Sequence, residues 1–249
     1  MDKYGLFGYP LGHSFSKRFF TEKFEREHIE AEYENYEIAD ISLYVDTLND
    51  NPELRGHNVT IPYKQQIIPY LDELSEEARE IGAVNVVRVG KKDGKRYLKG
   101  FNSDVIGFVE SLRPLLRPHH TKALILGTGG ASKAVRYGLE KKLGIETLYV
   151  SRTAKPGVIT YDQVTPELIH EYEVIVNCSP CGMFPKVDEC PLLPYDAMTS
   201  DNILYDLVYN PEETLFMRRG SENGAVVKNG LEMLILQAKA SWRFWNDEK

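Results

Sequence analysis

The chain has 249 residues, of which 42% are hydrophobic and 27% are charged, a composition typical of an ordinary globular protein and not of a disordered, collagen-like or coiled-coil chain. Its 30 Lys and Arg residues against 37 Asp and Glu residues give a net charge of −7. Without a block rich in Lys or Arg, this argues against a nucleic-acid binder and against a protein of anionic membrane surfaces.

Short β-rich runs alternate with amphipathic stretches along the chain, a pattern typical of α/β proteins with parallel sheets. We expect strands at Lys3–Tyr9, Glu32–Ile38, Arg55–Ile61, Val84–Val89, Lys122–Leu126, Thr147–Ser151, Val174–Asn177, Ile203–Val208 and Ala225–Val227. We expect helices at Ser16–His28, Asp72–Ile81, Asp104–Leu116, Gly129–Leu143, Pro211–Asn223 and Leu231–Trp245. The Asp-Gly pair in Lys91–Lys95 indicates a turn between two strands.

The length suits two domains, at roughly 100–200 residues each. The segment Arg113–Thr121 (RPLLRPHHT) has two prolines and no periodicity, so we place the boundary there or slightly upstream. The prediction is a first domain of residues 1–104 and a second of residues 105–230. The last helix has an apolar stripe wide enough to pack on another domain, so residues 231–249 are expected to complete the first.

The N-terminus and the cysteines bear on where the protein acts. Residues 1–20 contain Gly, Pro, His and Ser where a signal peptide needs an unbroken apolar stretch. The sequence has no run of about 18 apolar residues, the length that a membrane span requires. Cys178, Cys181 and Cys190 are too few for a disulfide framework. We therefore expect a cytoplasmic protein.

A glycine-rich turn, GTGGAS at Gly127–Ser132, follows the apolar strand Lys122–Leu126 and precedes a helix. In that context the free N–H groups and the positive helix end make a site for a phosphate. The match to G-x-G-x-x-G is incomplete, because Ser132 occupies the third glycine position. The turn indicates a nucleotide site, and a plain tight turn is the alternative.

The end of the next strand indicates which nucleotide would bind. Arg152 lies about 20 residues beyond the glycine turn, where NAD sites carry an Asp or Glu that holds the ribose 2′-hydroxyl. An Arg at this place accommodates a 2′-phosphate instead. The sequence therefore favours NADP over NAD, and a surface arginine at a strand end is the alternative.

Polar residues gather in the first domain, where GHNVTIPYK (56–64) begins as a strand that Pro62 stops. Open α/β sheets bind ligands at the carboxyl ends of their strands. Asn58 and Thr60 share one face of this strand by its period of two. Lys64 follows them, and the alternative for Lys64 is a solvated surface lysine.

For the other candidate residues, a purely structural role explains the sequence as well as a functional one does. Asp104 opens a helix, so its carboxylate is either an N-cap or a catalytic group, and the two roles are compatible. Ser14 and Ser16 supply hydroxyls that cap the first helix or hold a substrate carboxylate. Asn85 equally suits a polar position at the start of a strand.

The cysteines suggest a rival function. A strand followed by Cys178-Ser-Pro-Cys181 has the pattern of a dithiol redox site, although that motif belongs to small thioredoxin-like units. With Cys190 a zinc site would have only three ligands. The other histidines considered show no ligand spacing, and these are His28, His57, His119, His120 and His170. We predict no metal.

Seven motifs together resemble the shikimate dehydrogenase family over nearly the whole chain. They are GHNVTIPYK (56–64), GAVN (82–85), NSDVIG (102–107), GTGGAS (127–132), NCSPCGM (177–183), DLVYNP (206–211) and GLEMLILQA (230–238). The combination of NVTxPxK with NxDxxG is highly specific. The resemblance implies a two-domain α/β fold with an N-terminal substrate domain, a Rossmann-like NADP-binding domain and a cleft between them that closes during catalysis.

The resemblance also implies an activity: the reversible reduction of 3-dehydroshikimate to shikimate by NADPH, on the way to aromatic amino acids. We expect a monomer or a homodimer. The family's catalytic groups fall on Lys64 and Asp104. Its substrate contacts fall on Ser14, Ser16, Asn58, Thr60, Asn85, Tyr209 and Gln237. Its cofactor contacts fall on Gly127, Gly129, Gly130, Ala131, Ser151, Arg152, Thr153, Met183 and Gly230.

Three departures from the family pattern stand out. Ser151 replaces the usual Asn before the phosphate-binding Arg. Pro156 stands where a second basic residue is expected, with Lys155 one position early. The third departure is the pair of cysteines at 178 and 181. The nearest alternative is a quinate/shikimate dehydrogenase that uses NAD; a non-catalytic nucleotide sensor and a dithiol oxidoreductase are more remote.

Overall fold

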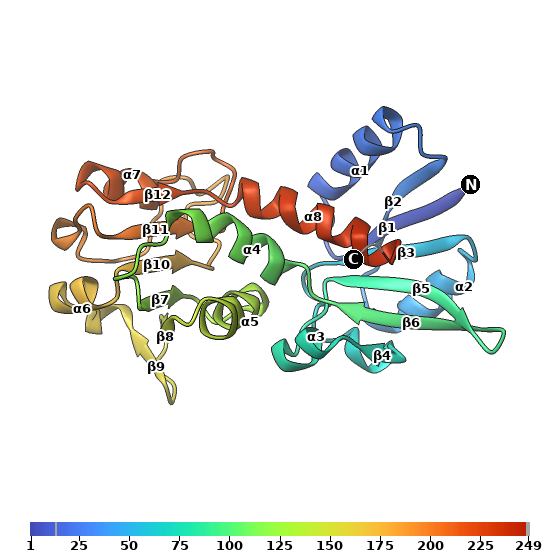
Figure 1. Ribbon diagram of the computed structural model, residues 1–249, viewed down its shortest axis with the longest axis horizontal. Coiled ribbons are helices and arrows are strands. Elements are labelled where there is room, and N and C mark those ends of the chain that lie inside the picture. The colour runs from blue at the N-terminus through green and yellow to red at the C-terminus, as the bar shows by residue number, and fades with distance from the viewer. Residues whose placement is uncertain (13, 248–249) are drawn as a thin grey trace. The chain divides into compact units, whose positions relative to one another are not determined.

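The computed structural model describes residues 1–12 and 14–247 and has an α/β fold, as expected (Figure 1). The chain divides into two compact units. The first unit comprises Met1–Ser103 with Gln237–Lys249, and the second comprises Asp104–Leu236. Each unit is built around its own six-stranded sheet.

The sheet of the first unit has the strand order β2-β1-β3-β5-β6-β4. Its strands are β1 (Asp2–Gly8), β2 (Ala31–Glu37), β3 (Leu54–Val59), β4 (Glu73–Leu74), β5 (Val86–Lys92) and β6 (Lys95–Phe101). β1 runs parallel to β2 and β3, but β5 runs antiparallel to β3 and β6. The expectation of a parallel sheet holds for β1 with β2 and β3 and for β4 with β6, and is wrong for β5. The turn expected at Lys91–Lys95 is confirmed, because Asp93 and Gly94, with φ of 52° and 75°, turn β5 directly back into β6.

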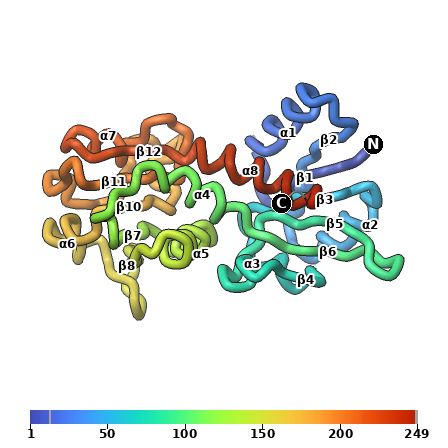
Figure 2. Tube along the Cα trace, viewed as in Figure 1, coloured from blue at the N-terminus to red at the C-terminus, as the bar shows by residue number. Residues whose placement is uncertain are grey.

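The helices of the first unit are α1 (Phe15–Arg26), α2 (Tyr44–Asn49), α3 (Glu76–Ile81) and the second part of α8 (Leu231–Trp245), which begins in the other unit (Figure 2). The helix expected over Asp72–Ile81 is wrong in its first half. The carboxylate of Asp72 accepts the N–H of Leu98 at 2.7 Å, and β4 pairs with β6. The helix begins only after Ser75, whose hydroxyl caps it.

The aromatic end of α8 belongs to the core of the first unit. Trp245 packs with Tyr4, Phe20 and Phe24 in one buried cluster, and its indole N–H donates to the carbonyl of Val87 at 3.1 Å. A Cβ atom at Gly56 of β3 would overlap the indole ring. The helix thus lies directly on the sheet, where only glycine leaves room for it.

The sheet of the second unit is parallel throughout, with the order β12-β11-β10-β7-β8-β9. Its strands are β7 (Lys122–Leu126), β8 (Glu146–Ser151), β9 (Val158–Thr160), β10 (Val174–Asn177), β11 (Ile203–Asp206) and β12 (Val226–Lys228). β7 and β10 are its central pair (Figure 1). The chain leaves β7 toward β9 on one side and returns to β10 on the other, so these two strands form the switch point at which such sheets bind ligands.

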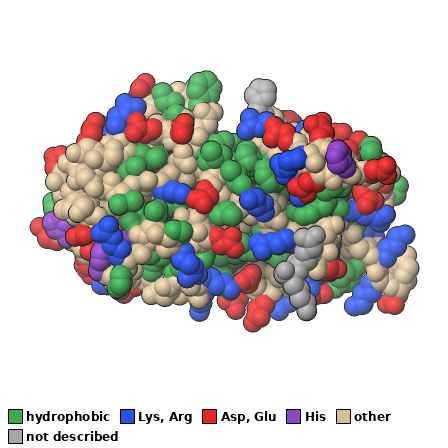
Figure 3. Space-filling view, turned by 45° about the horizontal axis from the view of Figure 1, so that its top comes forward, with side chains coloured by type: hydrophobic (Ala, Val, Ile, Leu, Met, Phe, Trp, Pro, Cys, Tyr) green, Lys and Arg blue, Asp and Glu red, His purple; other side chains and the backbone are tan. Residues whose placement is uncertain are grey.

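The helices of the second unit are α4 (Asp104–Leu112), α5 (Gly130–Tyr137), α6 (Pro166–Glu171), α7 (Leu215–Glu222) and the first part of α8. α5 continues into a π-helical turn at Gly138–Lys142. α7 begins later than expected, because Thr214 caps it by accepting the N–H of Met217 at 3.3 Å. Among the described residues no helix is both long and apolar enough to cross a membrane. Acidic and basic side chains are intermingled on the face shown in Figure 3.

Candidate active site

A cavity of about 770 Å³ lies at the carboxyl edge of the second sheet. Its walls come from the glycine turn after β7, the end of β8 and the long loop after β10. Five of the residues predicted to contact the cofactor line it: Gly127, Gly129, Ser151, Arg152 and Met183. The cavity therefore lies at the switch point of a parallel sheet, which is where dinucleotides bind.

The glycine turn forms one wall of this cavity. Gly127 has a φ of 103°, and a Cβ atom there would lie 3.4 Å from the backbone nitrogen of Ser179. Gly129 caps α5, and Gly130 and Ala131 open it, so their N–H groups have no partner within the helix. Ser132, in the third glycine position, is buried and donates its hydroxyl to the carbonyl of Gly129 at 2.7 Å. The turn thus accommodates Ser132 in place of the third glycine through a hydrogen bond of its own.

The end of β8 forms a second wall. Arg152 follows the strand, lines the cavity and is exposed, so its guanidinium is accessible to a phosphate group of a ligand. The hydroxyl of Ser151 accepts the N–H of Thr153 at 3.5 Å, which shapes the turn that carries Arg152. A guanidinium in this position suits a 2′-phosphate, because its planar donors match phosphate oxygens.

In the first unit, a separate hydrogen-bond network joins three of the predicted substrate residues, Asn58, Asn85 and Gln237. The hydroxyl of Tyr33 donates to the Oδ1 atom of Asn58 at 2.9 Å. Burial raises the pKa of Tyr33, and the nearby Ser16 side chain opposes this rise. Nδ2 of Asn58 donates to the carbonyl of Asn85 at 3.2 Å and to Ser241 Oγ at 2.9 Å. Ser14 lies nearby in sequence and caps α1 by accepting the N–H of Lys17.

The network continues through Asn85 to α8. Nδ2 of Asn85 donates to Ser103 Oγ at 3.0 Å and to Oε1 of Gln237 at 3.1 Å, and its Oδ1 accepts the N–H of Ser103 at 2.7 Å. The hydroxyls of Ser103 and Ser241 lie 3.2 Å apart. Sequence reasoning did not identify Tyr33, Ser103 or Ser241, although Ser103 stands inside the motif NSDVIG.

The two predicted catalytic residues belong to different units. Lys64 is half-buried, and its carbonyl accepts the N–H of Val84 at 2.7 Å, so the end of GHNVTIPYK lies against GAVN. Thr60 is also half-buried and donates its N–H to the carbonyl of Phe7 at 2.9 Å. Asp104 is the first residue of α4 and is only 4% exposed.

Comparison with known proteins shows which family this architecture represents. A family model for the shikimate dehydrogenase substrate binding domain matches residues 6–87. The chain is 37% identical to a shikimate dehydrogenase (NADP(+)) of Halothermothrix orenii, over 98% of this chain and 91% of that protein. It is also 37% identical to one of Clostridium beijerinckii, over 99% of this chain and 93% of that protein. The chain belongs to the shikimate dehydrogenase family.

A solved structure of this family agrees over the whole chain. Shikimate 5-dehydrogenase from Thermus thermophilus, determined in complex with NADP(H) and shikimate, is 31% identical with a TM-score of 0.85. The match covers 99% of this chain and 94% of that chain. The resemblance expected from the seven motifs is confirmed.

Three further family positions lie after β10, β11 and β12: Met183, Tyr209 and Gly230. Gly230 donates its N–H to the carbonyl of Val208 at 3.2 Å, and a Cβ atom there would overlap the carbonyl oxygen of Leu207. Only glycine therefore permits this close approach before α8. Tyr209 is 39% exposed and Met183 is 47% exposed, so both side chains are accessible to a ligand.

The three cysteines all line the cavity of the second unit. Burial raises the pKa of the Cys178 thiol well above its usual value, and it raises that of Cys181 as well. A dithiol redox site needs the opposite shift, because the thiolate is the reactive form. In this member of the family, the cysteine microenvironment therefore weighs against the dithiol alternative.

One histidine of the first unit is wholly enclosed beside the substrate network. His57 lies between Phe7 and Tyr44, and its Nδ1 faces the carbonyl of Asn58 at 3.3 Å. That nitrogen therefore carries the proton, and Nε2 accepts from the Tyr44 hydroxyl at 2.9 Å. Burial lowers the pKa of His57 to about 3, so the ring stays neutral.

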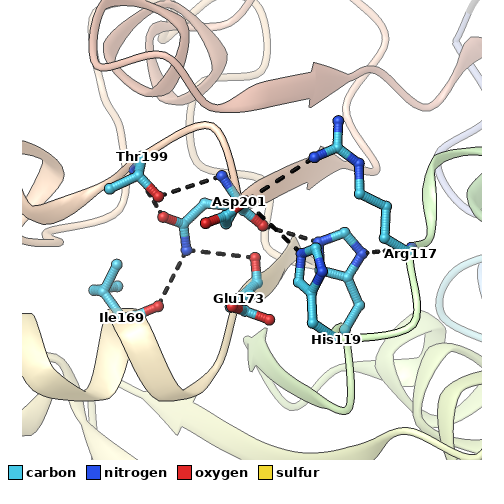
Figure 4. Close-up of polar contacts among 8 residues, drawn as sticks. Arg117, His119, Ile169, Glu173, Thr199 and Asp201 are labelled. Atoms are coloured by element: carbon cyan, nitrogen blue, oxygen red, sulfur yellow. Dashed lines mark hydrogen bonds and ion pairs between the residues drawn. The ribbon is translucent and has the colours of Figure 1, made fainter.

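Figure 4 shows a cluster that the spacing of the histidines does not reveal. His119, His120 and Glu173 bring potential metal-ligand atoms within 4.8 Å of one another. Nδ1 of His120 accepts the N–H of Arg117 at 2.8 Å, so the proton must lie on Nε2, which donates to the carbonyl of Asp201 at 2.8 Å. Neither ring nitrogen then has a lone pair for a metal, and the cluster fastens loops together.

Proposed function

We propose that the protein catalyses the reversible, NADP(H)-dependent interconversion of 3-dehydroshikimate and shikimate, in the pathway to aromatic amino acids. The observation that carries the proposal is the cavity at the switch point of the second sheet, with Arg152 on its wall, in a chain of the shikimate dehydrogenase family. The solved relative named as a complex with NADP(H) and shikimate supports both ligands.

In this proposal the first unit supplies six of the seven substrate residues, and the second unit supplies Tyr209 and all the cofactor residues. Seven residues are assigned to the substrate: Ser14, Ser16, Asn58, Thr60, Asn85, Tyr209 and Gln237. Nine are assigned to the cofactor: Gly127, Gly129, Gly130, Ala131, Ser151, Arg152, Thr153, Met183 and Gly230. The network of the first unit supports the substrate set, because amide and hydroxyl groups that hold one another in place are preorganised for the hydroxyls of a polar ring.

NADPH, when bound, supplies the hydride that reduces the ketone. Negative charge then develops on the carbonyl oxygen, and a positioned donor that stabilises this charge lowers the barrier. We assign that donor role to the ammonium of Lys64 and assign Asp104 to orienting it. In the reverse direction the same pair accepts the proton of the substrate hydroxyl.

Cofactor preference depends on the end of β8. Arg152 favours NADP, whereas Pro156 stands where the family has a second basic residue. Lys155 precedes it and is fixed by its carbonyl, which accepts the N–H of Val158 at 2.9 Å. Because of this departure, a quinate/shikimate dehydrogenase that uses NAD is the second candidate.

A crossed assay tests both candidates. Purified protein is incubated with shikimate or quinate and with NADP⁺ or NAD⁺, and reduced nicotinamide is followed by absorbance. The proposal expects the highest kcat/KM for shikimate with NADP⁺. Faster turnover of quinate with NAD⁺ would favour the second candidate, and no turnover with any of the four pairs would refute both.

A cytoplasmic location and a monomeric or homodimeric state complete the proposal. The cysteines at 178, 181 and 190 are all unpaired, which suits a reducing compartment. Light scattering coupled to size exclusion measures the mass of the particle against the 28.5 kDa of one chain.

A further inference from the structure

The carboxyl ends of β10 and β11 carry a buried hydrogen-bond cluster that the proposed chemistry does not use. It consists of Asn177, Asp206 and Thr214, and all three residues are 0% exposed. The cluster lies behind the wall of the cofactor cavity and not on its surface, since none of the three lines the cavity.

Asn177 fastens the loop that follows β10. Its Oδ1 atom accepts the N–H of Ser179 at 3.1 Å and the hydroxyl of Ser179 at 2.6 Å. Its Nδ2 atom donates to the carbonyl of Cys181 at 3.3 Å. The Ser179 hydroxyl oxygen in turn accepts the N–H of Cys181 at 3.3 Å. A single amide therefore fixes the backbone from Cys178 to Cys181.

This loop is part of the cavity wall and lies against the glycine turn. All four residues from Cys178 to Cys181 line the cavity. The Cβ position of Gly127 would be 3.4 Å from the nitrogen of Ser179 and 3.5 Å from the carbonyl carbon of Cys178. A side chain at position 127 would therefore touch the loop, which shows that the loop and the glycine turn are neighbours in the cavity wall. Any movement of the loop relative to the turn changes the width of the cavity.

Asp206 decides how the amide of Asn177 is oriented. Its Oδ1 atom accepts Nδ2 of Asn177 at 3.0 Å and the N–H of Val208 at 3.0 Å, and its Oδ2 atom accepts the Thr214 hydroxyl at 2.6 Å. An ionised carboxylate only accepts hydrogen bonds, so the NH₂ group of Asn177 must face Asp206 and its oxygen must face Ser179. The flipped amide would offer Ser179 two donors in place of an acceptor.

We propose that Asn177 and Asp206 are positioning residues for the cofactor: Asp206 orients the amide of Asn177, and that amide holds residues 178–181 at the distance from the glycine turn at which the cavity accepts NADP(H). The inference rests on the proposed function for the identity of the ligand. It concerns cofactor binding and predicts no change in the substrate network of the first unit.

The chain offers a matched control for Asn177. Asn202 is also buried, at 1% exposure, and its side chain also bonds to backbone, donating to the carbonyl of Ile169 at 3.1 Å and accepting the N–H of Thr199 at 2.9 Å. It precedes β11, at the amino edge of the same sheet. Replacing either Asn by Ser removes hydrogen bonds between a buried amide and the backbone. Asn177 makes them at the carboxyl edge of the sheet and Asn202 at its amino edge.

The test compares Asn177→Ser with Asn202→Ser in the full chain, using titration calorimetry with NADPH, steady-state kinetics and thermal melting. Both variants should melt at lower temperature. Asn177→Ser should weaken NADPH binding and raise its KM by at least about tenfold, as expected for lost buried hydrogen bonds. Its kcat at saturating NADPH and its KM for 3-dehydroshikimate should stay within about threefold of wild type, and Asn202→Ser should keep the wild-type NADPH affinity.

A second pair of variants covers the case in which Asn177→Ser does not fold. Thr214→Ser keeps the hydroxyl that Asp206 accepts, and Thr214→Val removes it. Thr214→Ser should bind NADPH as wild type does, whereas Thr214→Val should bind it more weakly. Wild-type NADPH affinity in Asn177→Ser, or in Thr214→Val if Asn177→Ser is unfolded, overturns the inference. Failure of the wild type itself to bind NADPH would overturn the proposed function instead.

Discussion

The buried imidazole of His57 makes the stability of the first unit dependent on pH. An unfolded histidine has a pKa of about 6.5, whereas burial lowers the pKa of His57 in the folded protein to about 3. Below pH 6.5 the unfolded chain binds a proton that the folded chain does not. The contribution to the free energy of unfolding is therefore fully present above pH 6.5 and is lost as pH falls from there toward 3.

The pKa of the unfolded histidine sets the size of the effect. Between about pH 7.5 and about pH 5, protonation of His57 in the unfolded chain should lower the free energy of unfolding by roughly 2 kcal/mol. This figure depends on the unfolded pKa alone, because the folded ring stays neutral over the whole interval. His57→Gln keeps a polar partner for the Tyr44 hydroxyl but does not titrate. We therefore expect the difference in stability between wild type and this variant to shrink by roughly 2 kcal/mol over that interval.

Urea unfolding at the two pH values, followed by tryptophan fluorescence, measures this difference, since Trp242 and Trp245 both lie in the first unit. His28→Gln is the matched control, because the side chain of His28 is exposed and hydrated in the folded and the unfolded chain. It should reproduce the wild-type change with pH. If wild type and His57→Gln lose the same stability between the two pH values, the neutral buried ring is not the cause and the reasoning is refuted.

Three further predictions concern the proposed activity and the packing of α8. Lys64→Ala should lower kcat by at least about 10²-fold with little change in the KM for shikimate, and a near-native kcat would exclude Lys64 from the chemistry. Arg152→Ala should raise the KM for NADPH and leave that for NADH nearly unchanged; an equal loss with both cofactors would contradict contact with the 2′-phosphate. Gly56→Ala should destabilise the first unit by about 1–3 kcal/mol in urea unfolding, because its Cβ overlaps the Trp245 ring, and unchanged stability would show that the ring moves freely.

Some elements could be predicted from local sequence alone. Lys122–Leu126, Val174–Asn177 and Leu231–Trp245 were expected with the bounds that the structure has. The first two are short, almost wholly apolar runs, as the central strands of a covered parallel sheet require. The long final helix has strong periodicity, and the glycine turn lies between a strand and a helix as its motif indicates.

Local patterns failed where a distant partner decides the conformation. Residues 72–74 have the composition of a helix start, yet Glu73–Leu74 pairs with β6 and the N–H of Leu98 donates to the carboxylate of Asp72, so the helix does not begin there. The Asp93-Gly94 turn between β5 and β6 has a local signal, whereas the antiparallel pairing of β5 with β3 is a property of the assembled sheet. A short segment with weak propensity takes the conformation that satisfies its backbone groups in the sheet.

The sequence by itself determined the α/β class, the family and the residue types on which the proposed chemistry depends, because these follow from periodicity and from motifs a few residues long. Only the tertiary structure decided how those residues are held. Asn58 bonds to Ser241, 183 positions away, and Asn177 bonds to Asp206, 29 positions away. Neither pair leaves a local signal, since a hydrogen bond depends on where the folded backbone brings a donor and an acceptor together.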